Sequence, residues 1–212
     1  MTDELRPPWL DAPPVDPYPY EETHDLRVGP DLHPALLGLL PFVGVWRGRG
    51  GGDYPTINAF EFAQEVRLSH DGRPFLAYES RAWLIEPDGT PIRPAFREVG
   101  YWRPVLVASE SVKRAKRVSD AVGDTAGEQT DAVEALLMGQ TGIVESYVGR
   151  IDGLRVELIT DQVLRSATAK EVSEAHRLYG IVDTALLYAY EMAAVGQPLQ
   201  AHLSAKLARV AG

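Results

Sequence analysis

Five histidines are the main candidates for metal chemistry in this chain of 212 residues, which contains no cysteine. They form no His-x-His, His-x-x-x-His or His-Glu-x-x-His pair, so a zinc site of the usual kind is not expected. His24 and His33 lie in or beside a proline-rich segment, and His70 falls in a turn, where a solvated ring needs no explanation. His176 lies on a predicted strand, and His202 lies near the C-terminus. The pattern therefore suits a site that needs a single imidazole.

Most other catalytic patterns are missing from the sequence. Without cysteine there are no disulfides, thiolate metal sites, iron–sulfur clusters or cysteine nucleophiles. There is no Gly-x-Ser-x-Gly elbow, and the glycine-rich run 48–52 lacks the Gly-Lys-Ser/Thr ending of a phosphate-binding loop. Glu61 and Glu65 share a strand face, and a solvent-exposed face explains them more simply than a catalytic pair of acids. A haem needs only one protein donor, because the porphyrin supplies four ligands, so any single histidine would suffice.

The composition narrows the classes of partner. The formal net charge is −9, from 30 acidic and 21 basic residues. Nucleic-acid binding needs a basic footprint and is not expected here. No apolar run approaches the roughly 20 residues that span a bilayer, and residues 1–30 lack the pattern of a signal peptide. We therefore expect a cytoplasmic protein that does not bind membranes.

Two segments differ from the single domain expected over residues 34–212. Residues 1–33 predict a flexible acidic arm, because prolines remove backbone donors and little apolar surface is available to bury. Aromatic residues of this arm could still dock on the surface. Residues 109–134 predict a polar, mobile insertion, too long for a hairpin loop; a solvated amphipathic helix over 112–122 is the alternative. The prolines of the arm are Pro7, Pro8, Pro13, Pro14, Pro17, Pro19 and Pro30.

The rest of the chain shows the alternation that is typical of strands, most clearly over 60–69. A short buried helix is expected from Pro34, since proline is tolerated in a first turn. The spacing predicts an all-β fold, either an up-and-down antiparallel barrel or a sandwich. Residues 199–210 fit a helix or a closing strand, and we favour the strand. The other expected strands are 75–85, 96–106, 136–138, 142–148, 154–160, 172–179 and 185–193.

A glycine-rich motif marks the first strand of the expected fold. Gly44, Trp46, Gly48 and Gly50 alternate, which predicts a strand that runs into a glycine-rich bend. A Gly-x-Trp pair at this place is common in lipocalin-like barrels, where the indole plugs one end. The motif therefore predicts fold rather than chemistry.

Several further motifs, in order along residues 34–210, resemble the nitrobindin family. They are Gly44-x-Trp46-x-Gly48-x-Gly50, Tyr54-Pro55-Thr56-Ile57, Phe60-Glu61-Phe62 with Glu65-Val66, Ser69-His70-x-Gly72-x-Pro74-Phe75-Leu76, Glu98-x-Gly100-Tyr101, Thr168-Ala169-Lys170-Glu171-Val172 and Met192-Ala193-x4-Gln197-Pro198-Leu199-x-x-His202-Leu203. The resemblance implies a ten-stranded antiparallel barrel, like the fatty-acid-binding proteins, with one haem b in a wide cleft.

The resemblance also implies the roles of three residues. His202 takes the place of the family's axial iron ligand and would be the catalytic residue. Thr56 falls where the family contacts haem, and Lys170 would be a further contact, because a cation suits the propionates. A ferric haem of this kind binds NO reversibly and isomerises peroxynitrite to nitrate. Arg47, Arg49 and Lys170 would offset the acidic net charge in attracting that anion.

Two other classes of function stay open. The barrel could carry a fatty acid or another apolar ligand, with His202 as a packed or surface residue. It could also carry or sense NO without turnover, with the arm and the insertion as partner-docking elements. A Soret band would separate the first class from the haem proteins, and nitrate yield would separate the enzyme from the NO carrier. A homodimer is a further hypothesis.

Overall fold

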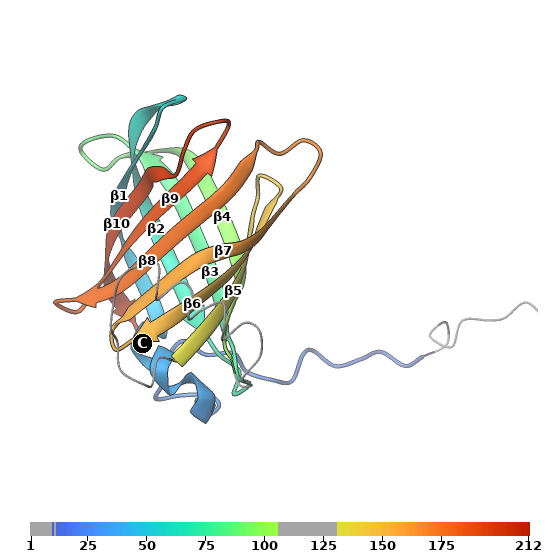
Figure 1. The fold of residues 1–212 in the computed structure, drawn as a ribbon. Helices are drawn as coiled ribbons and strands as arrows, with labels where there is room; N and C mark the ends of the chain where they lie inside the picture. Colours follow the sequence, from blue (N-terminus) through green and yellow to red (C-terminus); the bar gives the residue numbers. More distant parts are fainter. Residues whose placement is uncertain (1–9, 11, 106–130) are drawn as a thin grey trace, which may run out of the picture.

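Ten antiparallel strands close into one barrel in the computed structural model, which describes residues 10, 12–105 and 131–212. Each strand pairs with its neighbours in sequence, and β1 also pairs with β10 (Figure 1). The all-β, ten-stranded up-and-down barrel with a short N-terminal helix is thus confirmed. The strands are β1 (Gly44–Tyr54), β2 (Ile57–Ser69), β3 (Leu76–Ile85), β4 (Pro91–Pro104), β5 (Asp131–Gly139), β6 (Ile143–Asp152), β7 (Arg155–Arg165), β8 (Val172–Val182), β9 (Ala185–Ala194) and β10 (Gln200–Ala211).

The C-terminal segment is the closing strand rather than a helix. β10 is bonded on both sides, to β9 and to β1. Its leucine spacing of four fitted a helix, but four is also a multiple of the two-residue period of a strand. Ala205 and Leu207 face the core, while Ser204 and Lys206 are exposed. Pairing on both edges decides between the two interpretations.

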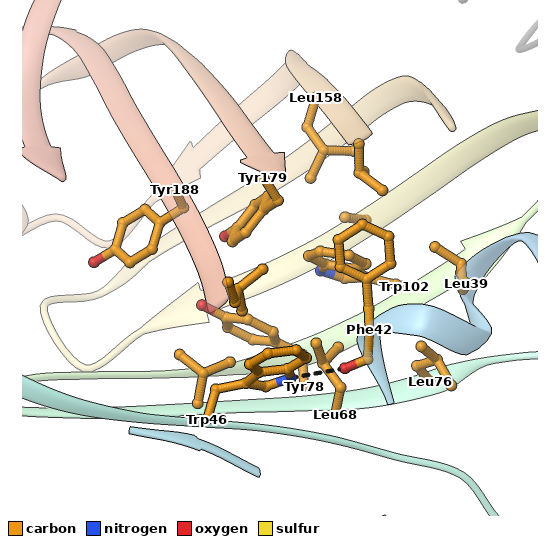
Figure 2. Close-up of a cluster of buried hydrophobic side chains, with 14 of the residues drawn as sticks. Leu39, Phe42, Trp46, Leu68, Leu76, Tyr78, Trp102, Leu158, Tyr179 and Tyr188 are labelled. Atoms are coloured by element: carbon orange, nitrogen blue, oxygen red, sulfur yellow. Dashed lines mark hydrogen bonds between the residues drawn. The ribbon is translucent and has the colours of Figure 1, made fainter. Parts of the chain in front are cut away.

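A short helix closes one end of the barrel. This element, η1 (Pro34–Phe42), is a 3₁₀ helix whose Leu36, Leu39 and Phe42 are buried. The indole Nε1 of Trp46 donates to the carbonyl of Phe42 at 2.9 Å, as Figure 2 shows. Trp46 has no exposed surface, which confirms that it plugs the core.

The glycine-rich bend was a wrong prediction, because β1 continues unbroken through these glycines. A Cβ on Gly48 would lie 2.1 Å from the Lys206 carbonyl oxygen of β10. On Gly50 it would lie 2.4 Å from the ring of Phe62 and from the Ser204 oxygen. The glycines therefore allow close packing against the inner face of β1, not a turn. Gly44, at φ +146°, begins the strand after η1.

Part of the segment predicted to be a flexible arm is bound to the barrel. Thr23 and His70 exchange backbone hydrogen bonds of 2.8 Å, and the Ser69 hydroxyl donates to the carboxylate of Glu22. This contact covers His70, which is 1% exposed. The solvated histidine expected in this turn is therefore buried.

The predicted insertion at 109–134 falls mostly outside the described residues. Its last four residues belong to β5, which begins at Asp131. No helix among the described residues is long and apolar enough to cross a membrane.

The inner face of β1 has no room for a side chain at Gly50. Gly50→Ala should lower the free energy of unfolding by roughly 1–3 kcal/mol, because the new methyl meets a backbone oxygen that cannot turn away. Gly51→Ala is the matched control, since its Cβ would meet nothing closer than 3.9 Å, and should change stability by less than about 0.5 kcal/mol. Urea unfolding of both variants checks this, and equal losses would contradict the packing argument.

Candidate functional site

A cavity of about 560 Å³ is lined by residues of the barrel strands and of the turns that connect them. Its rim includes Thr56 in the β1–β2 turn, Lys170 between β7 and β8, and Val195 between β9 and β10. These turns lie at the upper end of the barrel in Figure 1, opposite η1. His202 also lines the cavity, so the three residues implied by the resemblance come together in one site. Gly44, Trp46, Gly48 and Gly50 do not line it and serve the fold.

A break in strand register lets His202 face this cavity. In β10, Leu203, Ala205 and Leu207 share the inward face, so strict alternation would send His202 outward. The pairing with β9 shifts between Ala201 and Leu203, which makes His202 the extra residue of a bulge. Bulges re-aim side chains, and here both His202 and Leu203 line the cavity.

A backbone carbonyl orients the imidazole of His202. Its Nδ1 lies 3.0 Å from the carbonyl oxygen of Asp53. A carbonyl only accepts, so Nδ1 carries the hydrogen and Nε2 keeps its lone pair. Burial lowers the pKa of His202, against a smaller opposing effect of this hydrogen bond. The ring is therefore neutral at pH 7 and has one donor nitrogen available to a metal.

Three aromatic rings surround the imidazole. The ring centroid of His202 lies 5.4 Å from that of Tyr54, 5.9 Å from Tyr190 and 6.4 Å from Phe60. Phe60 can reach this place because Gly52 has no Cβ; a Cβ there would lie only 2.3 Å from the ring of Phe60. The glycines of β1 thus make room for packing beside His202.

A buried ionic cluster on the cavity wall was not expected from the sequence. The guanidinium of Arg177 donates to both oxygens of Glu98 at 2.7 and 2.6 Å and to Glu145 at 2.8 Å. Its Nε donates to the hydroxyl of Tyr147 at 2.7 Å, and that hydroxyl donates to Glu145 at 2.8 Å. Tyr190 also donates to Glu145, at 3.1 Å.

The partners of Arg177 stabilise its positive charge. Burial alone would lower its pKa, but the facing Glu98, Tyr147 and Glu145 outweigh burial and raise the pKa well above the usual arginine value. The signal in the sequence was an arginine on the same strand face as Ala175 and Tyr179, both buried. A charge in that position requires partners from other strands.

The donor set suits haem better than a bare metal ion. No group of three or more His, Cys, Asp or Glu side chains within the described ranges is placed to hold a metal. Among the described residues that line the cavity, His202 is the one histidine. The neutral imidazole suits an axial ligand of haem iron. The mixed apolar and polar wall suits a porphyrin, and Lys170 at the rim suits a propionate.

Comparison with known proteins agrees with this geometry. The family model of the THAP4-like, heme-binding beta-barrel domain matches residues 35–209. The chain belongs to this family. It is 59% identical to a peroxynitrite isomerase of Salinispora arenicola over the whole of both chains. It is 41% identical to a ferric nitrobindin-like protein of Nocardia farcinica, over 91% of this chain and 74% of that one. The nitrobindin resemblance is therefore confirmed.

A solved relative supports the same architecture. The crystal structure of Rv2717c from M. tuberculosis superimposes with a TM-score of 0.66 at 38% identity, over 84% of this chain and 99% of that one. A peroxynitrite isomerase of Streptomyces griseus is 44% identical over 88% of this chain and 90% of its own length. The alignment with the S. griseus protein leaves out only a small part of either chain.

The lowered pKa of His202 predicts a pH effect on the haem-free protein. In the unfolded chain this ring titrates near 6.5, and burial places its folded pKa lower. As the pH falls, the unfolded state binds this proton before the folded state does. The free energy of unfolding is therefore highest above about pH 6.5 and decreases as the pH drops below it. Unfolding at pH 7.5 and 5.5 should show a smaller loss for His202→Gln than for the parent. His176→Gln, on the outer face, is the control, and equal losses in parent and His202→Gln would contradict the assignment.

Proposed function

We propose that this protein isomerises peroxynitrite to nitrate at a ferric haem b whose axial ligand is His202. The observation that carries the proposal is the neutral imidazole, anchored through Nδ1 to Asp53 and facing a cavity of about 560 Å³. The family is a haem-binding barrel, and several relatives are named peroxynitrite isomerase.

When bound, ferric haem would supply a Lewis-acidic iron that polarises the peroxide bond of the anion. The chain has little further chemistry to perform. Peroxynitrite and nitrate contain the same atoms and charge, so one O–O bond breaks, one N–O bond forms, and no proton or external electron is consumed. His202 holds its Nε2 toward the cavity, and the Asp53 carbonyl keeps Nδ1 protonated.

The arginines at the cavity are occupied. Arg97 is paired with Glu79 at 2.6 Å, and Arg177 with Glu98 and Glu145. The N–H groups of Arg177 are all directed at these carboxylates and at neighbouring tyrosine hydroxyls, so this buried guanidinium is not available to hold an oxygen of the ligand. The saturation of Arg177 favours an isomerase over enzymes that cleave peroxides with a buried distal arginine.

Lys170 and Thr56 are proposed to bind the haem propionates. Both are exposed at the rim, where a carboxylate can meet a cation or a hydroxyl without burial. Lys170 would also attract the peroxynitrite anion. Arg47 is an unsuitable candidate for that task, because it points away from the cavity and pairs with Glu65.

We also propose reversible binding of NO at the same site, since NO needs only an accessible sixth position. The fatty-acid carrier is less well supported, because the buried Arg177 already faces two carboxylates and has no free donor pair for a third. A cytoplasmic location and a homodimer remain predictions, which cell fractionation and sedimentation would test.

His202→Ala should lose most of the haem affinity while keeping the fold. Removing an axial donor leaves only porphyrin packing and the propionate contacts. Hemin titration followed by the Soret band should show a high-spin ferric spectrum for the parent and a lost or shifted band for the variant. Nitrate yield from peroxynitrite should fall with it. His176→Ala is the control, and a variant spectrum identical to the parent's would refute the ligand assignment.

Lys170→Met should have a smaller effect, because an exposed ion pair contributes about 0.2–1 kcal/mol. We expect haem to dissociate less than about fivefold faster, with the difference shrinking in high salt. Transfer of haem to an acceptor protein measures the rate. If haem dissociated faster from the variant by the same factor at low and high salt, the result would argue against a propionate contact.

A further inference from the structure

We propose that Tyr54 is a positioning residue for His202, acting by fastening the irregular end of β1 to β9. The proposal rests on the haem site proposed above and adds a residue whose side chain fixes the axial ligand without binding iron. It predicts that the hydroxyl of Tyr54, and not only its ring, determines how well the imidazole is oriented.

The hydroxyl of Tyr54 reaches a strand that is not a neighbour of its own. It accepts from the backbone N–H of Ala194 at 2.9 Å and lies 3.2 Å from the carbonyl oxygens of Met192 and Ala194. Both partners are on β9, and β10 lies between β9 and β1 in the sheet. The phenol therefore spans the inner side of β10, where His202 lies. Tyr54 is only 3% exposed.

The end of β1 needs such an anchor. The paired residues of β1 and β10 end at Gly52 and Leu203. On the other side, the register with β2 shifts between Gly52 and Tyr54. Asp53 thus falls where the regular ladder has ended, yet its carbonyl is the group that holds His202 Nδ1. The β1–β10 ladder does not reach that carbonyl. Beyond it, the backbone of β1 is held by the Tyr54–Ile57 pair with β2 and by the side chain of Tyr54, which ties it to β9.

Two consecutive residues consequently hold the imidazole. The Asp53 carbonyl sets the hydrogen-bond direction and tautomer, and the Tyr54 ring packs against His202 at an interplanar angle of 75°. The Tyr54 hydroxyl is tied to β9, which is hydrogen-bonded to β8 on one side and to β10 on the other. Both contacts to the imidazole are therefore anchored to an interior strand of the closed sheet. Groups that orient a metal ligand in this way affect metal affinity strongly.

Tyr54→Phe is the decisive variant, because it keeps the ring and removes the hydroxyl. We expect haem to dissociate about 10-fold faster and the iron–histidine stretching band of the ferrous protein to shift or broaden. Tyr179→Phe is the matched control: Tyr179 is equally buried but does not line the cavity. It should lose stability without changing that band. Identical bands and haem-loss rates in Tyr54→Phe and the parent would overturn the proposal.

A measurement on the haem-free protein separates this proposal from the haem site itself. In the parent, ¹⁵N NMR should show His202 as the single tautomer protonated at Nδ1, with slow exchange of the Ala194 amide. Tyr54→Phe should show mixed tautomers and faster exchange. If the parent binds no haem but shows this difference, the proposed function fails and the positioning role stands. Mixed tautomers or a rapidly exchanging Ala194 amide in the parent would refute the role without any variant.

Discussion

The pairing of β10 with β1 closes the sheet, and the rest of the molecule depends on this closure. It removes both free edges, which would otherwise expose unpaired backbone groups. It also brings the first and the last strand into contact, so that Asp53 can orient His202. The glycines of β1 make the contact possible, because side chains at Gly48 and Gly50 would collide with the backbone of β10.

Closure divides the interior into two unlike halves. At the η1 end, Trp46, Phe42 and Trp102 form a packed apolar core, and the Trp46 indole satisfies the Phe42 carbonyl (Figure 2). At the other end the wall carries the Arg177 cluster and the cavity. A buried ionic cluster is costly unless every member is paired. Here Glu98 accepts two hydrogen bonds from Arg177, and Glu145 accepts from Arg177, Tyr147 and Tyr190. The apolar half provides the stability that permits a polar, hollow half.

Two of the departures from regular strand pairing lie at the candidate site. His202 is the extra residue of the β10 bulge, and Asp53 lies beside a register shift. Val195, at φ +47°, is a β-branched residue in a left-handed conformation on the cavity rim. Such conformations persist where the surrounding structure imposes them, and the Val195 N–H donates to the Glu171 carbonyl next to Lys170. The regular barrel therefore supports an irregular rim.

The sequence by itself determined the strand periods, the all-β class and the plugging role of Trp46. Its family motifs added the barrel and the small set of residues that converge on the cavity. Alternation and motif order are local properties, so they are readable along the chain. Only the tertiary structure decided that the glycine run packs rather than bends and that His70 is covered by the arm. It also decided that His202 points inward, whereas strict alternation along the strand predicts that it points outward. The partner of His202 and those of Arg177 lie on other strands, and register brings them together only when the sheet closes.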